Sequence, residues 1–215
     1  MKIALSRIHF PVRTLGPGAR IAVWLQGCSI RCPGCVSMDT WVEDQHITTL
    51  DEVKEALLPS LPLADGVTIS GGEPFDQPEA LLALLQWLRG VHSGDLFVYS
   101  GHTFEALQQK LAAFDGLIDA VMTDPFRQDI GQTLALRGSD NQRLFFLTEL
   151  GRQRFAAFER QRGREDRALD IMFDDHTGEI FLAGIPARGD LERLVNQMKA
   201  DGHSLLTTAD KRTAS

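Results

Sequence analysis

The three cysteines of the chain lie close together. Cys28, Cys32 and Cys35 fall within LQGCSIRCPGC, residues 25–35, and no other cysteine occurs in the 215 residues. An odd number of clustered thiols is a poor disulfide framework, whereas soft thiolates bind zinc, Cu(I) or iron–sulfur clusters. The neighbouring glycines and proline allow a tight loop that turns the sulfurs inward. The spacing therefore favours a metal centre.

The number of thiols limits the kind of centre. A structural zinc ion takes four protein ligands, so a distant histidine such as His9 or His46 would have to complete the set. In a [4Fe-4S] cluster, three cysteines hold three irons and leave the fourth iron open to a ligand that is not protein. A third interpretation is three structural thiols beside a turn. The narrow C-x3-C-x2-C spacing favours the cluster.

A second group of residues follows a β-branched run in DGVTISGGEP. Gly71 and Gly72 would let the backbone approach a ligand at the end of a strand, and Glu73 offers a carboxylate suited to an ammonium group. A Gly-Gly turn with an acidic residue is more often only a turn. It becomes evidence for a site through its combination with the cysteines.

Both groups stand at the ends of predicted strands. Sequence patterns predict strands at 2–8, 20–26, 95–101, 117–124 and 143–147, and a further short β-branched strand within 65–74 that ends in two glycines. Helical spacing predicts helices within 48–58, 76–90 and 102–114, the first with Thr49 as its N-cap. Strands that alternate with helices imply parallel pairing through crossover helices, and hence an α/β sheet or a barrel of such units.

The C-terminal third differs in character. Residues 151–167 are rich in Arg, Glu and Gln and predict a solvated helix, with a docking surface as the alternative. Residues 169–186 predict a hairpin around Asp-His-Thr-Gly, and 189–200 predict a helix with Leu191, Leu194, Val195 and Met198 on one face. We expect both to complete the core and to cover an open edge of the sheet. The predicted organisation is a core at 1–145, an extension packed on the same domain at 146–206 and a flexible tail at 207–215.

Composition excludes several classes of partner. Hydrophobic residues make up 43% and charged residues 24%, which is ordinary for a soluble globular protein. The formal net charge is -7, so a nucleic-acid partner is not expected. No apolar run approaches the 18 residues of a membrane span, and the N-terminus shows no cleavable leader. We expect a cytoplasmic protein with no membrane partner.

C-x3-C-x2-C followed by GGEP resembles the radical S-adenosylmethionine (SAM) superfamily. The resemblance implies that Cys28, Cys32 and Cys35 are the ligands of a [4Fe-4S] cluster, and that Gly71, Gly72 and Glu73 bind SAM. It also implies the fold, an incomplete (β/α) barrel of the radical-SAM type, here with a C-terminal hairpin-plus-helix extension.

The match narrows to one branch of that superfamily. Residues 15–41 resemble the glycyl-radical activating enzymes, above all the anaerobic ribonucleotide-reductase activases, which also read Cys-Pro-Gly-Cys. YSGHTFEAL, VMTDPF and RGSDNQ follow in the same order. By this resemblance Ser100 and Asp124 face the cofactor at strand ends, and Gly34 replaces the aromatic residue that commonly precedes the third cysteine. Asp124 is equally well explained as a cap before Pro125, and His102 either adjoins the adenosyl group or simply opens a helix.

The activity implied is that of an oxidoreductase. One electron, from a donor such as flavodoxin or ferredoxin, would cleave SAM to a 5′-deoxyadenosyl radical that removes hydrogen from a protein or peptide substrate. A glycyl-radical enzyme such as anaerobic ribonucleotide reductase is the leading substrate. A maturase acting on another protein or peptide is the alternative, because the chain continues well beyond the RGSDNQ segment. A non-catalytic iron–sulfur or zinc module is the alternative of another class.

Overall fold

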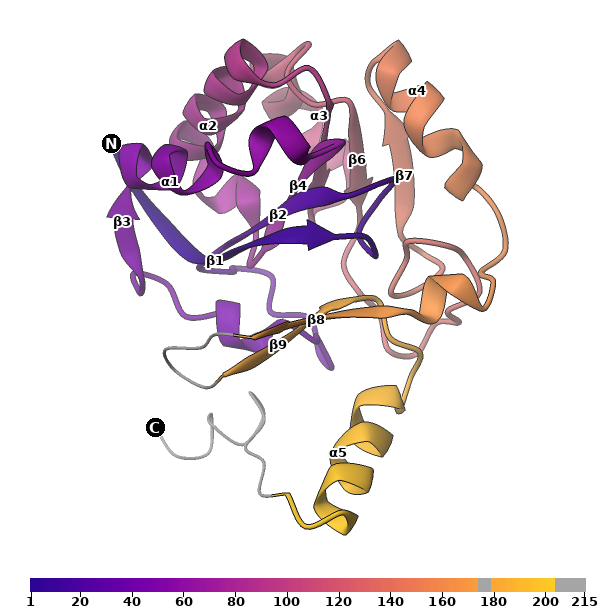
Figure 1. Ribbon diagram of the computed structural model, residues 1–215. Helices are drawn as coiled ribbons and strands as arrows, with labels where there is room; N and C mark the ends of the chain where they lie inside the picture. Colours follow the sequence, from indigo (N-terminus) through magenta and orange to yellow (C-terminus); the bar gives the residue numbers. More distant parts are fainter. Residues whose placement is uncertain (174–178, 204–215) are drawn as a thin grey trace.

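A computed structural model of the chain describes residues 1–173 and 179–203. Its main feature is a seven-stranded sheet in the order β3-β1-β2-β4-β5-β6-β7 (Figure 1). The strands are β1 Lys2–Val12, β2 Arg20–Leu25, β3 Ile47–Thr49, β4 Gly66–Gly71, β5 Asp95–Tyr99, β6 Ala120–Thr123 and β7 Arg143–Phe146. Strands β2, β4, β5 and β6 are parallel, and β1, β3 and β7 add antiparallel partners at the two sides.

Crossover helices connect the parallel strands, as the alternating pattern predicts. The helices are α1 Leu50–Leu57, α2 Pro78–Val91, α3 Phe104–Leu111, α4 Glu149–Phe155 and α5 Asp190–Ala200. Thr49 caps α1 as predicted, and its hydroxyl and the Glu52 carboxylate form a reciprocal capping box. No helix in the described part of the chain is long and apolar enough to cross a membrane.

The core has two sides because side chains alternate along each strand. Ile21, Val23 and Val121 belong to the cluster that α1, α2 and α3 cover. Residues between them in the sheet, such as Ala22 and Met122, point to the opposite face, where α4 and the C-terminal hairpin pack (Figure 1). The fold class is therefore mixed α/β with a largely parallel sheet. The described strands form an open sheet, so the expected incomplete barrel is not confirmed.

The C-terminal hairpin, β8 Leu169–Phe173 and β9 Ile180–Gly184, forms a two-stranded sheet of its own. The expectation that it covers an edge of the main sheet is wrong, because it packs through Ala183 and Met172 against one face of β1 and β2. Its predicted Asp-His-Thr-Gly turn and the predicted tail lie outside the described residues, which omit 174–178 and 204–215.

Two further predictions for the extension need correction. The Arg- and Glu-rich stretch is not one solvated helix: α4 ends at Phe155, which is buried, and short 3-10 turns follow. The last helix, α5, buries none of its residues and stands away from the sheet (Figure 1). Hydrophobic spacing identified its apolar side, but that spacing does not say what lies opposite.

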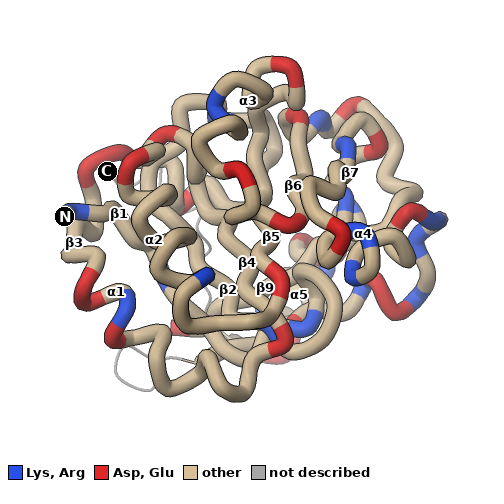
Figure 2. The backbone as a smooth tube through the Cα atoms, turned by 90° about the horizontal axis from the view of Figure 1, so that it is seen from above, with Lys and Arg blue, Asp and Glu red and all other residues tan. Residues whose placement is uncertain are grey.

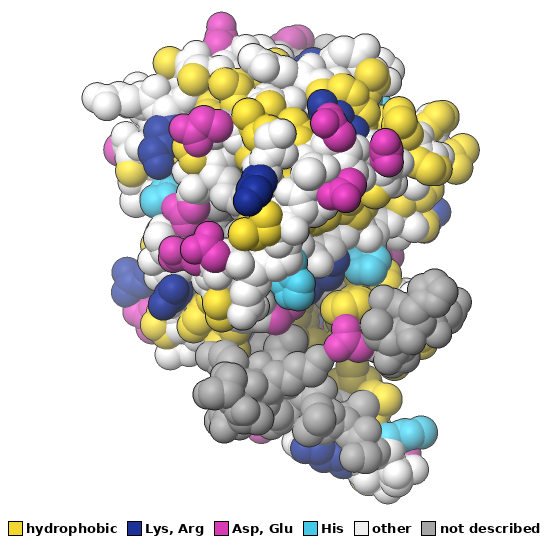
Figure 3. All heavy atoms as spheres, turned by 90° about the vertical axis from the view of Figure 1, so that its left-hand side faces the viewer, with side chains coloured by type: hydrophobic (Ala, Val, Ile, Leu, Met, Phe, Trp, Pro, Cys, Tyr) yellow, Lys and Arg dark blue, Asp and Glu magenta, His cyan; other side chains and the backbone are white. Residues whose placement is uncertain are grey.

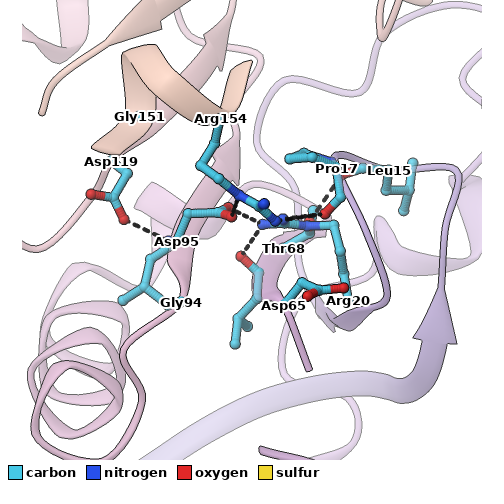
Figure 4. A network of polar contacts seen from close by, with 12 residues as sticks. Leu15, Pro17, Arg20, Asp65, Thr68, Gly94, Asp95, Asp119, Gly151 and Arg154 are labelled. Carbon is cyan, nitrogen blue, oxygen red and sulfur yellow. Dashed lines mark hydrogen bonds and ion pairs between the residues drawn. The ribbon is translucent and has the colours of Figure 1, made fainter. Parts of the chain in front are cut away.

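A buried ion-pair network lies at the amino ends of the parallel strands (Figure 4). Arg20 opens β2 and is fully buried; it donates to the Asp95 carboxylate at 2.5 Å and to the Thr68 hydroxyl at 2.6 Å. Arg154 of α4 donates to the other oxygen of Asp95 at 3.0 Å. The network joins β2, β4, β5 and α4 at the end of the sheet opposite the loops described next.

Candidate functional site

The predicted site residues meet at one edge of the sheet. The cysteine loop leaves β2, the Gly-Gly-Glu loop leaves β4, Ser100 follows β5 and Asp124 follows β6. These four strands are parallel neighbours in the sheet. Their carboxyl ends therefore bring residues spread over about a hundred positions of sequence into one place, where open α/β sheets bind ligands.

The cysteine loop holds its thiols among backbone amides. Cys28 is buried, whereas Cys32 and Cys35 are half-buried. Burial raises the pKa of each thiol, and the sulfurs lie close enough for Cys28 to raise the pKa of the other two further. Opposing this, the amides of Ile30 and Arg31 hydrogen-bond to Cys28, and the Ser37 amide donates to the Cys35 sulfur at 3.4 Å. Arg31 adopts a positive φ of 51°, which helps its amide face inward.

This donor set fits an iron–sulfur cluster. Amides that point at cysteine sulfurs stabilise thiolate ligands and tune a bound cluster. Within residues 1–173 and 179–203, no three His, Cys, Asp or Glu side chains converge tightly enough to hold one metal ion. Cluster-binding cysteines each hold a different iron, so they need no such convergence.

The histidines proposed as a fourth zinc ligand lie elsewhere. The ring of His9 packs between Trp24 and Phe181, with centroid distances of 5.8 and 5.4 Å. His46 is exposed in the loop before β3. The structure therefore offers no support for a zinc ion completed by either histidine.

Close contacts with neighbouring backbone leave no room for a Cβ at Gly71 and Gly72. Gly71 has a φ of 113°, and a Cβ there would lie 2.3 Å from the backbone nitrogen and oxygen of Leu25. A Cβ on Gly72 would lie 1.8 Å from the carbonyl oxygen of Gly27. The Glu73 amide donates to that same oxygen at 2.9 Å. The two glycines thus press the loop after β4 against the start of the cysteine loop. The sequence alone suggested close approach to a ligand, and the structure adds this contact between the two loops.

Gly72→Ala is expected to disturb both loops. Because the new Cβ would meet backbone rather than a flexible side chain, the loops must separate, and we expect a loss of about 2–4 kcal/mol of unfolding free energy. Iron incorporation should fall with it. The matched control is Gly90→Ala, because nothing lies within 4 Å of a Cβ at that helical position; it should leave stability unchanged or raise it by up to about 1 kcal/mol. Chemical unfolding and iron content measure both, and equal effects of the two substitutions would contradict the argument.

Glu73 and Ser100 lie in direct contact. The Glu73 carboxylate is 1% exposed and accepts hydrogen bonds from the Ser100 hydroxyl at 2.9 Å and from the amides of Phe75 and Gly101 at 3.0 and 2.8 Å. Burial raises its pKa to about 7, although these hydrogen bonds act against the shift. The carboxylate therefore joins the ends of β4 and β5, and it is not freely presented to a ligand.

Stability of the cofactor-free chain is expected to fall as Glu73 ionises. The pKa is raised on folding, so the stabilisation is complete below the unfolded value of about 4.3 and is lost as the pH rises through 7. We expect the unfolding free energy to drop by about 2–3 kcal/mol between pH 5 and pH 8, since one pKa unit is worth about 1.4 kcal/mol. Urea unfolding across this range measures it. The Glu73→Gln variant should lack this slope, and identical pH profiles for the two proteins would refute the assignment.

Asp124 is held in an unusual conformation. It has a φ of 78°, although it is not glycine, and its carboxylate accepts from Arg143 Nε at 2.7 Å and from the Thr123 hydroxyl at 2.8 Å. Arg143 also forms two hydrogen bonds of 2.8 Å with Glu105 of α3. Backbone strain of this kind persists only where surrounding contacts enforce it, and it gathers at functional sites. Both the cofactor and the capping interpretation of Asp124 stay predictions.

Gly34 and the segment after Asp124 lie against each other. Gly34 has a φ of 75°, and a Cβ there would lie 2.7 Å from Gln128 Oε1 and 3.5 Å from the ring of Phe126. The Phe126 amide hydrogen-bonds to Cys32. An aromatic ring therefore stands beside the position where Gly34 replaces the usual aromatic residue.

Sequence reasoning missed Asp76 and Arg143. The Asp76 carboxylate accepts from the amide and hydroxyl of Ser29 at 2.7 and 2.9 Å, and lies 3.8 Å from His102 Nε2. It thereby ties the cysteine loop to the Gly-Gly-Glu loop and to the end of β5. An acidic residue just after GGEPF was a visible signal, but its partner lies 47 residues away.

Comparison with known proteins also indicates an iron–sulfur protein. The 4Fe-4S single cluster domain family matches residues 14–145, so the chain belongs to that family. The predicted class, a radical SAM enzyme with a [4Fe-4S] cluster and SAM as cofactors, is confirmed.

Relatives with named activities indicate which kind of enzyme the chain resembles. The anaerobic ribonucleoside-triphosphate reductase-activating proteins of Enterobacteria phage T4 and Escherichia coli K12 are each 29% identical to this chain, across 62% of it and 88% and 93% of their own lengths. The pyruvate formate-lyase-activating enzyme of Staphylococcus aureus USA300 is 33% identical across 59% of this chain and 54% of its own. The solved structure of QueE from Escherichia coli aligns with 48% of this chain and 54% of its own at 19% identity and a TM-score of 0.42, too loosely to bear on the argument. More than a third of this chain thus lies outside the match to the reductase-activating proteins.

Proposed function

We propose that the chain activates a glycyl-radical enzyme, such as an anaerobic ribonucleotide reductase, by removing a hydrogen atom from a glycine of that protein. When bound, the cluster and SAM supply the chemistry: one-electron cleavage of SAM to an adenosyl radical. The observation that carries the proposal is the contact between the cysteine loop and the Gly-Gly-Glu loop, through Gly27 and Gly72, within the segment that matches the family.

Different residues of the chain have different roles in the proposed activity. We assign Cys28, Cys32 and Cys35 as cluster ligands. Gly34, Gly71, Gly72, Glu73, Ser100 and Asp124 form the SAM site. Glu73 acts mainly by fixing the ends of β4 and β5, because its carboxylate is already hydrogen-bonded inside the protein. We infer residues 1–145 to be the core, of the incomplete-barrel type, and 146–206 to be the extension.

Exposed apolar side chains on the extension support a protein substrate. Ile171 pairs with Leu182 and Phe173 with Ile180 across the hairpin, so the four share one face. Phe173 is 69% exposed and Ile171 59%. Exposed apolar side chains that gather in one patch often mark a site of interaction with another protein. A flavodoxin or ferredoxin would supply the electron.

The test uses the anaerobically reconstituted full chain. It is incubated with SAM, a reductant and an anaerobic ribonucleotide reductase, and followed by electron paramagnetic resonance. We expect a glycyl-radical doublet on the reductase and one equivalent of 5′-deoxyadenosine, both absent without SAM. SAM cleavage with a closed-shell modification and no doublet would select the maturase alternative. Absence of SAM cleavage would leave only the non-catalytic module.

A further inference from the structure

An arginine-lined cavity lies between the extension and the segment that follows Asp124. Its volume is about 420 Å³, and four of its nine lining residues are Arg162, Arg167, Arg188 and Arg193. The other lining residues are glutamine, threonine, glycine and alanine, and none is acidic. The cavity is thus surrounded by hydrogen-bond donors, and such a surface suits an anion.

Positive charge at the cavity exceeds the negative charge that neutralises it. Asp190 is hydrogen-bonded to both Arg167, at 3.4 Å, and Arg193. Asp166 does not line the cavity; it forms an ion pair with Arg160 at 2.6 Å and accepts a hydrogen bond from the Gly163 amide. Among the described residues, Arg188 donates to the carbonyl oxygens of Arg127 and Ile130, and the Asp129 carboxylate lies near enough to interact with its charge. This concentration is local, because the chain as a whole carries a net charge of -7.

Figure 2 shows basic residues around α4 and the neighbouring segment, with acidic residues among them. On the face shown in Figure 3, acidic and basic side chains are also interspersed over the rounded core. The concentration of arginines is therefore confined to the lining of the cavity. Four guanidinium groups around one cavity repel each other, and a multivalent anion would relieve that repulsion.

Arg162 is incompletely hydrogen-bonded. Its Nη2 donates to the carbonyl oxygens of Asp166, at 3.0 Å, and Ile185. Its Nε and Nη1 are buried and have no hydrogen-bond partner among the described residues. Burial lowers the pKa of this guanidinium; Asp166 acts against the shift, and Arg167 adds to it. A buried charged donor without a partner is costly, and a bound oxygen ligand would supply the missing acceptor.

We propose that this cavity binds a ligand with two or more negatively charged oxygen groups, phosphoryl or carboxylate. Planar guanidinium forks match the oxygen pairs of both groups. The ligand would join the extension to residues 126–133, because Arg188 holds Arg127 and Ile130 while the Arg162 amide donates to the Thr133 carbonyl at 2.7 Å. That segment continues to Phe126, which lies beside Gly34. Binding of the anion would thus order residues 126–133, which lie next to the cysteine loop.

The test measures anion binding by the reconstituted full chain. Inorganic pyrophosphate and citrate are titrated by calorimetry and in thermal unfolding, with sodium chloride at matched ionic strength as reference. We expect a Tm rise of roughly 2–6 °C at saturation beyond the chloride effect. Tighter binding of pyrophosphate would identify a phosphoryl ligand, and tighter binding of citrate a carboxylate ligand. Equal Tm values in all three salts would overturn the proposal.

Variants locate the site. Arg193→Gln removes a guanidinium at the cavity and should weaken binding at least about tenfold, since a charge-assisted hydrogen bond is lost. Arg162→Gln should do the same, and Arg193→Gln keeps the test valid if Arg162→Gln does not fold. The matched control is Arg164→Gln, an exposed arginine of the same segment that does not line the cavity. Equal loss of affinity in Arg164→Gln and Arg193→Gln would show general charge attraction and refute the site. The proposed activation of a glycyl-radical enzyme is unaffected by either result.

Discussion

Cys32→Ala is expected to abolish formation of 5′-deoxyadenosine from SAM. Cys32 is half-buried in a loop and its sulfur receives the Phe126 amide, so its removal deletes a cluster ligand without opening a cavity in the core. Two remaining thiols cannot hold three irons. We expect less than about 1% of the wild-type rate, because even partners of metal ligands cost 10- to 100-fold when removed. The reaction is followed by chromatography of the nucleoside product.

Three further measurements separate loss of the cluster from loss of the fold. Iron and sulfide content of Cys32→Ala should fall below that of the wild type, while its circular dichroism and unfolding midpoint without cofactors stay close to wild type. Cys28→Ala should lose activity too, but with some loss of stability, because Cys28 is buried. Substantial SAM cleavage by Cys32→Ala would contradict the assignment of all three cysteines as ligands.

Features that depend on local spacing could be predicted from the sequence. The three cysteines lie within eight residues, and their loop necessarily stays together wherever the chain folds. Ser100 and Asp124 were expected at strand ends from the resemblance to the family, and the parallel strands β5 and β6 do bring them to the same edge of the sheet. What could not be predicted was which hydrogen-bond partners these residues have. The Glu73 carboxylate was expected to meet an ammonium group, but the Ser100 hydroxyl and the amides of Phe75 and Gly101 already donate to it.

Long-range partners and the outer layer escaped prediction for a physical reason. Asp124 bonds to Arg143 and Asp76 to Ser29, and no periodicity links such pairs. The hairpin and α5 were both expected to complete the core; the hairpin does so through Met172 and Ala183, whereas its other face and all of α5 are not buried. Periodicity reports that a face is apolar and is silent on its partner, so Phe173 could equally have been a core residue or, as observed, an exposed one.

The two ends of the sheet have different tasks, which explains why buried charges occur at both. At the carboxyl ends, Asp124 is strained and buried, and its carboxylate is bound by Arg143, whose side chain is 42% exposed. At the amino ends, Arg20 and Asp95 are fully buried, and their hydrogen bonds are made within the protein (Figure 4). A Cβ on Gly66 would lie 2.6 Å from Arg20 Nη1, so even the first residue of β4 is chosen to make room for this pair. Damage there should affect folding and spare the chemistry.

Asp95→Asn is therefore expected to destabilise the fold strongly. The substitution leaves the Arg20 guanidinium buried without its countercharge, and breaking one side of a buried ion pair costs about 3–5 kcal/mol. For a chain of this size the unfolding midpoint should fall by roughly 10 °C. Arg154→Gln should cost less, because Arg154 is 34% exposed and water can replace part of its contact with Asp95. Thermal and urea unfolding of the two variants measure the difference.

Asp115→Asn is the matched control, since it removes the same charge at an exposed position. It should change the unfolding free energy by less than about 0.5 kcal/mol. Well below its unfolding midpoint, Asp95→Asn should still bind the cluster and cleave SAM at close to the wild-type rate, because all three cysteines lie at the opposite end of the sheet. If Asp95→Asn were as stable as Asp115→Asn, the buried network would contribute nothing to the fold. If it were stable but inactive, the separation of a structural end from a chemical end would be wrong.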